Sequence, residues 1–306
     1  MKPDLEVNLA GLRLKNPVLT ASGTFGFGLE YARLVDLGAI GAVVLKSVTL
    51  HSRQGNPPPR VTETPAGMLN SIGLENPGAP AVVSKVVPEL KRLGVKVIAS
   101  VAGETVEEYG EVARRFAAAG VDAIEVNLSC PNVARGGLTF GCTRGMAAAV
   151  TAAVRQAAGD LPVFAKLGVT GGNLLEIAGA VAEAGASGFS LINTLPGLAV
   201  DLRQRRPVLG NVTGGLSGPA IKPVALWAVW QVYKAFKLPV IGMGGIMSTS
   251  DALEFFLCGA TAVAVGTGNF VNPRLTTEIV AGLEKALAAE HVSDIKELIG
   301  AAHNGK

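Results

Sequence analysis

Short apolar runs rich in Val and Ile recur along the chain, separated by longer segments with apolar residues at helical spacing. A strand buried on both faces shows as such a continuous run, because neither face needs polar side chains. Eight runs are predicted as strands, at residues 17–21, 41–46, 95–101, 123–127, 163–167, 188–193, 239–242 and 262–266. The predicted helices include residues 105–119, 146–158, 174–184, 219–236, 250–258 and 274–290.

Eight strands that alternate with helices, without a Pro- or Ser-rich linker, predict an α/β fold of the (β/α)8 TIM-barrel type. The 306 residues suffice for one such barrel, which needs about 250, so we expect a single domain over residues 1–306. A hairpin over residues 6–14, turning at Ala10 and Gly11, is expected to plug the barrel floor. An open doubly wound sheet is the alternative fold.

Two connections are much longer than a barrel needs, at residues 47–78 and 194–218. Both follow the carboxyl ends of predicted strands, the face on which barrel enzymes build their sites. We therefore expect long loops that act as lids or ligand walls. A third segment, 128–141, contains Gly136 and Gly137 and is expected to hinge over the site.

Composition narrows the class of partners. The chain is 49% hydrophobic and 17% charged, its formal charge is +3, and its densest basic run is RQRR at 203–206, so nucleic-acid binding is not expected. No apolar run reaches 18 residues and no signal sequence is visible, which predicts a soluble, cytoplasmic protein without membrane contact. Three dispersed cysteines, at 130, 142 and 258, predict neither a disulfide framework nor a metal site.

Small or polar side chains stand at or beside the end of every predicted strand. If the strands form a barrel, these side chains meet in one opening and predict a polar ligand there. They are Ser22, Lys46, Ser47, Ser100, Asn127, Lys166, Asn193 and Thr194.

Glycines cluster after the last two strands, in GMGGI (242–246) and VGTGNF (265–270). Backbone N–H groups at Gly244, Gly245 and Gly266 can approach a phosphate closely, and Thr267 adds a hydroxyl. No G-x-G-x-x-G follows a strand and no P-loop is present, so the usual dinucleotide and nucleoside-triphosphate sites are not predicted.

Cys130 follows the fourth strand in EVNLSCPN (125–132), between Asn127 and Asn132. A thiol ionises at about pH 8.5 unperturbed, so it can act as a base near neutrality. A buried structural cysteine beside a turn is the alternative.

Cationic Lys46 and Lys166 could stabilise negative charge on a ring. Together with the phosphate site and the thiol, they favour flavin mononucleotide (FMN). A Schiff-base lyase using Lys166 and a non-catalytic phosphate-binding scaffold remain as alternatives.

The motifs NPVLTASGTFGFG, LKSVT, NSIGLENPG, EVNLSCPNV, FAKLGVT, LINT, GGLSGPAIKP, GMGGI and VGTGNF together resemble the catalytic subunit of class 1B dihydroorotate dehydrogenase. The likeness runs in unbroken order from about residue 5 to 283. It implies an FMN barrel that oxidises dihydroorotate to orotate in pyrimidine biosynthesis. It also implies that Cys130 removes the C5 proton while a hydride passes from C6 to flavin N5.

The resemblance assigns contacts by position. Substrate contacts fall on Lys46, Asn70, Ser71, Ile72, Gly73, Leu74, Asn127, Asn132, Asn193 and Thr194. Flavin contacts fall on Ser22, Lys46, Ser47, Ser100, Asn127, Lys166, Ile192, Gly218, Gly244, Gly245, Gly266 and Thr267. Ser100 departs from the asparagine that is usual in the family, and its shorter side chain weakens the expected flavin contact there.

The segment NVARGGLTFG after Cys130 resembles class 1B rather than class 1A. Class 2 members carry a membrane-associating extension and a serine base, and this chain shows neither. Members of class 1B pair with a subunit that carries FAD and a [2Fe–2S] cluster and delivers electrons to NAD. The resemblance therefore implies a homodimer of this chain that forms a heterotetramer with two such partners.

Overall fold

Eight parallel strands form the centre of the protein in the computed structural model, which describes residues 2–128, 143–170 and 172–304. They are β3 (Val18–Thr20), β4 (Val43–Val44), β7 (Val97–Val101), β8 (Ala123–Asn127), β9 (Val163–Leu167), β10 (Gly188–Leu191), β15 (Val240–Met243) and β16 (Ala262–Val265). Neighbours in space follow chain order from β4 to β16, with β3 beside β16. A parallel bridge between Leu19 and Ala42 joins β3 to the start of β4 and closes the ring. The predicted barrel is confirmed, and the open sheet is wrong.

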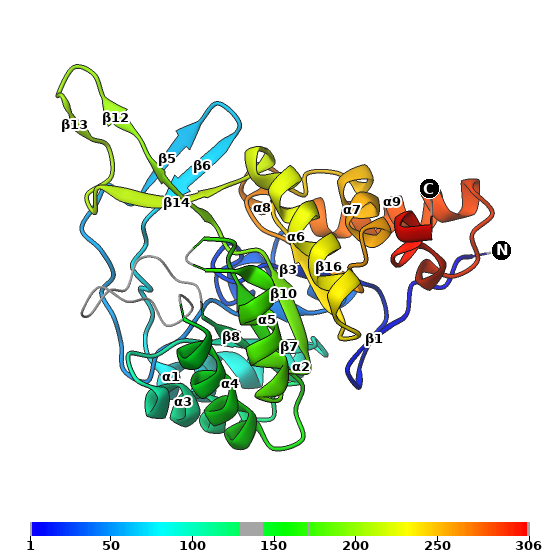
Figure 1. Cartoon of the computed structure of the whole chain (residues 1–306), viewed down its shortest axis with the longest axis horizontal. Helices are drawn as coiled ribbons and strands as arrows, with labels where there is room; N and C mark the ends of the chain where they lie inside the picture. Colours follow the sequence, from blue (N-terminus) through cyan, green and yellow to red (C-terminus); the bar gives the residue numbers. More distant parts are fainter. Residues whose placement is uncertain (1, 129–142, 171, 305–306) are drawn as a thin grey trace.

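Helices cover the outside of this barrel (Figure 1). They are α1 (Ala79–Ala81), the π-helical turn η3 (Val82–Val86), α2 (Val87–Arg92), α3 (Val106–Ala118), α4 (Arg144–Ala158), α5 (Leu174–Glu183), α6 (Lys222–Ala235), α7 (Thr249–Leu257), α8 (Gly268–Val271) and α9 (Leu275–Ala289). Short 3₁₀ turns are η1 (Leu29–Tyr31), η2 (Leu37–Ala39), η4 (Pro219–Ile221), η5 (Ile295–Leu298) and η6 (Ala301–Asn304). Thr105, Asn173 and Ser248 accept backbone N–H groups at the starts of α3, α5 and α7, which explains those boundaries. The helix predicted at 219–236 begins later, because its first three residues form η4.

The leading hairpin is β1 (Val7–Leu9) paired with β2 (Leu12–Leu14). Ala10 and Gly11 both have positive φ, 52° and 97°, the backbone that a tight two-residue hairpin turn requires. Alternate residues of the two strands are buried and belong to the same apolar cluster as the barrel strands. The predicted hairpin is therefore confirmed, and its buried side chains extend the apolar core.

Both long connections contain strands, whereas the sequence predicted plain loops. They contain β5 (Val61–Thr64), β6 (Gly67–Asn70), β11 (Leu195–Leu198) and β14 (Thr213–Ser217), which form one antiparallel sheet in the order β11-β14-β6-β5. A further hairpin pairs β12 (Val200–Asp201) with β13 (Arg206–Pro207). These strands project together from the barrel, at the upper left of Figure 1. They are short and interrupted by glycines, so their alternating pattern is weak in the sequence.

Lys222 ties the start of α6 to α7 through Asp251, with 2.6 Å between Nζ and Oδ1. Asp251 also accepts the Met247 N–H and the Ser248 hydroxyl. Burial raises the pKa of the Asp251 carboxyl, but these hydrogen bonds outweigh it and leave the pKa below its usual value. The same hydrogen bond raises the pKa of Lys222. The pair therefore stabilises the fold between about pH 4 and pH 10.

We expect Asp251→Asn to lower the free energy of unfolding at pH 7 by about 1 kcal/mol, because the amide keeps the backbone contact but loses the ion pair. A lowered carboxyl pKa gives stability above about pH 4 that is lost as the pH falls through the folded value. Urea unfolding should therefore show a smaller difference from wild type at pH 3 than at pH 7. Glu254→Gln, which alters the more exposed partner of Lys222, is the control and should cost less. An equal loss for Asp251→Asn at both pH values would contradict the ion-pair explanation.

Candidate active site

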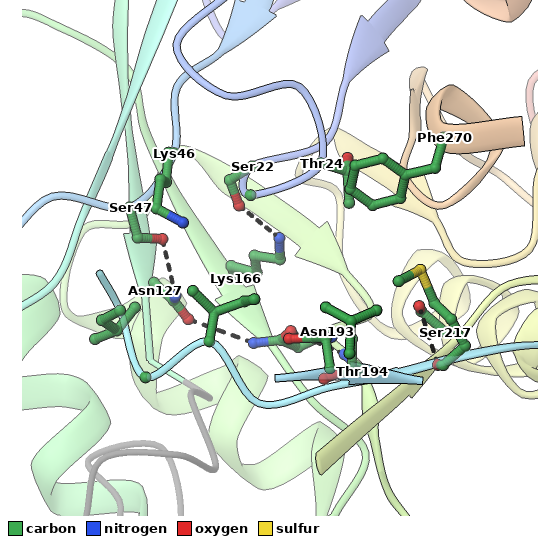
Figure 2. Close-up of a pocket in the computed structure, with 17 residues that line it drawn as sticks. Ser22, Thr24, Lys46, Ser47, Asn127, Lys166, Asn193, Thr194, Ser217 and Phe270 are labelled. Carbon is green, nitrogen blue, oxygen red and sulfur yellow. Dashed lines mark hydrogen bonds between the residues drawn. The ribbon is translucent and has the colours of Figure 1, made fainter. Parts of the chain in front are cut away.

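The polar side chains at the strand ends line one pocket at the carboxyl end of the barrel (Figure 2). The pocket is a cavity of ≈ 160 Å³ that opens to solvent. The predicted residues that line it are Ser22, Lys46, Ser47, Asn70, Ile72, Gly73, Leu74, Asn127, Lys166, Asn193 and Thr194. They lie at or just after the ends of five barrel strands, at the end of β6 and in the segment after β6, so the predicted convergence is present.

Asn127 lies at the centre of a hydrogen-bonded network across this pocket. Its Nδ2 donates to Ser47 Oγ at 3.0 Å, and its Oδ1 accepts from Asn193 Nδ2 at 3.4 Å. The Ser47 hydroxyl is in turn 2.9 Å from that of Ser100. Tyr109 donates its hydroxyl to the backbone oxygen of Asn127 at 2.9 Å and holds the strand end from behind. The two amides are thus oriented before any ligand binds, which suits recognition of a planar ring with alternating donors and acceptors.

Two lysines line the same pocket. The Lys166 side chain is only 6% exposed, and its Nζ donates to Ser22 Oγ at 2.9 Å. Lys46 follows β4, and its backbone N–H donates to Gly26 at 3.0 Å. Figure 2 shows both side chains directed into the cavity. Two cations in a partly enclosed space favour an anionic ligand, or a ligand on which negative charge develops.

The predicted contacts Gly218, Gly244, Gly245, Gly266 and Thr267 are not among the residues that line the pocket. Some of them meet beside Ser217, at its edge. Thr267 Oγ1 donates to Ser217 Oγ at 2.7 Å, and Ser217 lines the cavity. A Cβ on Gly245 would stand 2.9 Å from the backbone oxygen of Gly218, so these two glycines are in contact. Gly218, Gly244 and Gly245 have φ of 95°, 126° and 80°. This corner combines close backbone with two hydroxyl groups, a donor set that fits a phosphate.

Gly266 differs from the other glycines of this corner. A Cβ there would meet Ala21 and Thr24 only at ordinary contact distance, 3.7 and 3.9 Å. Protein packing therefore does not require a glycine at this position, whereas the approach of a ligand would.

Some predicted contacts do not line the pocket. Ser71 is fully buried, and its hydroxyl accepts from Asn56 Nδ2 at 3.0 Å, so it holds the segment that carries Asn70. Ser100 is buried and contacts Ser47, through which it can act on the pocket. Ile192 is buried in the core beside Asn193. Cys130 and Asn132, with the predicted hinge at Gly136 and Gly137, lie outside the described residues.

Other lining residues were not predicted. They are Gly23, Thr24, Val61, Met68, Ser217 and Phe270. Ser217 belongs to the motif GGLSGPAIKP, so the sequence already indicated that this segment lies near the site. Val61 and Met68 enter through the pairing of β5 and β6, which no local pattern reveals.

The closed barrel, with fixed amides and two lysines in one cavity beside a phosphate-fitting corner, defines a barrel enzyme of the kind that binds a phosphate-bearing cofactor and a small polar substrate. Comparison with known proteins names the family. The family model described as Dihydroorotate dehydrogenase matches residues 4–287, and the chain belongs to that family.

Relatives agree along the whole chain. The "Dihydroorotate dehydrogenase B (NAD(+)), catalytic subunit" of Desulforudis audaxviator (strain MP104C) is 57% identical over 99% of both chains. The protein of the same description from Desulforamulus reducens is 56% identical over 99% of this chain and 100% of its own length. That of Geobacter sulfurreducens is 53% identical over 98% of both chains. Within the part of the chain that the structure describes, no helix combines the length and the apolar character needed to cross a membrane.

Proposed function

We propose that this chain is the catalytic subunit of an NAD-linked dihydroorotate dehydrogenase, which oxidises dihydroorotate to orotate in pyrimidine biosynthesis. The observation that carries the proposal is the Asn127 network, which fixes amides from two strands beside two buried or half-buried lysines in one pocket. Membership of the family over nearly the full length supports the same activity.

We propose FMN as the cofactor of this chain, held in one domain over residues 1–306. Its phosphate would be held by the backbone at Gly218, Gly244, Gly245 and Gly266 and by the Thr267 hydroxyl, a corner that fits such an anion. Ser22, Ser47, Ser100, Ile192 and Lys166 would contact or support its ring system. When bound, the flavin supplies the hydride acceptor of the reaction.

The chain itself would bind and orient the substrate and take its proton. Asn70, Asn127, Asn193 and Thr194, with Asn132, would pair with the ring amides and carbonyls, and Lys46 would offset the substrate's negative charge. The backbone of Ile72, Gly73 and Leu74 would wall the ring from the other side, with Ser71 behind them. Cys130 would take the proton from C5 as the hydride leaves C6, and the two lost bonds become the C5–C6 double bond of orotate.

The relatives' description as a catalytic subunit implies a partner. We propose that the partner carries FAD and a [2Fe–2S] cluster and passes the electrons to NAD, and that two copies of this chain and two partners form a heterotetramer. We also propose that the complex works in the cytoplasm.

The test is to purify this chain alone and to assay dihydroorotate oxidation with an artificial dye, fumarate and NAD in parallel. We expect a yellow protein that reduces the dye and does not reduce NAD until the partner is added. Rapid reduction of fumarate would assign a different electron acceptor. A folded, colourless protein that cannot be reconstituted with FMN would contradict the flavin assignment.

The Schiff-base alternative has less support, because Lys166 Nζ donates to Ser22 and faces a carboxylate. A Schiff-base lysine must instead be available to attack a carbonyl. Borohydride trapping of a substrate on Lys166 would revive the alternative.

A further inference from the structure

Glu125 is a buried carboxylate in the interior of the barrel that takes no part in the proposed reaction. It lies on β8 two residues before Asn127, so both side chains point to the same face of the strand. Asn127 points into the pocket, and Glu125 therefore stands one layer below it. Its partners in register are Ser100 on β7 and Phe164 on β9. The Glu125 side chain is 1% exposed.

In the part of the chain that the structure describes, Lys166 is the cation beside Glu125. Its Oε1 lies 3.8 Å from Lys166 Nζ, and neither of its oxygens has a hydrogen-bond partner among the described residues. Ser190, the register partner of Lys166 on β10, likewise has a buried hydroxyl without a described partner. An apolar side chain would fill this layer at lower cost, because a buried carboxylate loses its hydration. Glu125 therefore has a function other than packing.

We propose that Glu125 is a positioning residue that holds the Lys166 ammonium at the mouth of the barrel and offsets its charge. This inference rests on the proposed function, because the charge at the mouth then acts on the bound flavin. Lys166 is held from two sides, by the Ser22 hydroxyl at the mouth and by Glu125 in the layer below. Lys46 adds a second cation to the pocket. The ion pair of Glu125 with Lys166 balances one of the two positive charges.

Loss of the Glu125 charge should make the flavin easier to reduce and less ready to pass its electrons on. A reduced flavin carries more negative charge than an oxidised one, so an extra net positive charge beside it favours reduction. The substitution Glu125→Gln keeps the shape of the side chain and removes only the charge. A role confined to packing predicts no change in flavin properties for this variant.

The experiment compares wild type and Glu125→Gln, both loaded with FMN, in the absence of dihydroorotate. Sulfite adds to oxidised flavins and leaves a negatively charged adduct, so its affinity reports the charge at the mouth. We expect the sulfite dissociation constant of the variant to fall on the order of tenfold. For a two-electron couple that factor corresponds to a midpoint potential about 30 mV more positive. Glu111→Gln removes a carboxylate on the outer helix α3 and should change neither value.

A second measurement needs no flavin. Removal of Lys166 alone leaves an unpaired buried carboxylate, which is strongly destabilising, so Lys166→Met should lower the urea midpoint more than the double variant Lys166→Met/Glu125→Gln does. Unchanged sulfite affinity in Glu125→Gln, or a double variant less stable than Lys166→Met, would overturn the inference. If the chain binds no flavin at all, the proposed function fails, while the unfolding comparison still decides whether Glu125 and Lys166 are coupled.

Discussion

Cys130→Ala is expected to lower kcat for dihydroorotate oxidation by at least about 1000-fold while the chain retains its flavin. Cys130 follows Asn127, which lines the pocket, by three residues in the sequence. Without the thiol no side chain assigned above can take the C5 proton, and general-base catalysis contributes about 100- to 10,000-fold. The measurement is steady-state oxidation with dye, together with the flavin content of the purified variant.

Cys130→Ser sharpens this test, because a hydroxyl ionises far less readily than a thiol. The serine variant should be slow at neutral pH and should gain rate as the pH rises. Cys258 supplies the control. Burial and the nearby Glu254 raise the pKa of its thiol, and it caps α7 outside the pocket, so Cys258→Ser should keep a near-normal rate. A near-normal rate at pH 7 in Cys130→Ala would refute the assignment of the base.

Gly245→Ala is expected to weaken flavin binding by at least about tenfold, the second large effect. A Cβ at this position would lie 2.7 Å from Lys222 Cβ and 2.9 Å from the Gly218 backbone oxygen, and its φ of 80° is strained for any other residue. The segment that carries Gly245 must then move away from Gly218 and Lys222. The backbone N–H groups of the proposed phosphate corner would no longer all reach the phosphate. Fluorescence titration of the flavin-free chain with FMN measures the loss.

Gly94→Ala is the matched control for backbone strain. Gly94 has a similar φ of 70°, but a Cβ there would meet nothing within 4 Å. The left-handed backbone should cost both variants about 1 kcal/mol of folding stability, and the close contacts of the new Cβ should cost Gly245→Ala more. Only Gly245→Ala should lose flavin. Equal flavin affinity in both variants would place the phosphate elsewhere.

The parts of the fold that sequence predicts well are those buried on both faces. The predicted strands 123–127 and 163–167 coincide with β8 and β9, because every residue of each is buried and apolar runs have clear ends. Predicted strand 41–46 shrinks to β4, Val43–Val44, where the flanking residues pair only through isolated contacts. The helical segment from α1 to α2 contains Pro80 and Pro88 and is not among the predicted helices.

The site divides in the same way. The strand-end residues are predictable because topology alone brings parallel strand ends together. The sheet β11-β14-β6-β5 is not, because Asn70 and Gly215, which are hydrogen-bonded at 3.2 Å, are 145 positions apart in the chain. Glu125 stands in the most informative motif of the sequence, yet its importance depends on a lysine that a different strand supplies. Such pairings belong to the tertiary structure and leave no local trace.

The pairing of β6 with β14 limits how a substrate can reach the pocket. The two strands belong to the two long connections, 47–78 and 194–218. In their pairing, Met68 lies opposite Ser217, Leu69 opposite Leu216 and Asn70 opposite Gly215. Met68, Asn70 and Ser217 also line the pocket, so the two connections, joined by this pairing, form one part of its rim. Neither can swing aside without breaking the ladder or carrying its neighbour along. A substrate that enters on this side therefore requires the whole projecting sheet to move as a unit. Otherwise it must enter and leave through a different side of the opening.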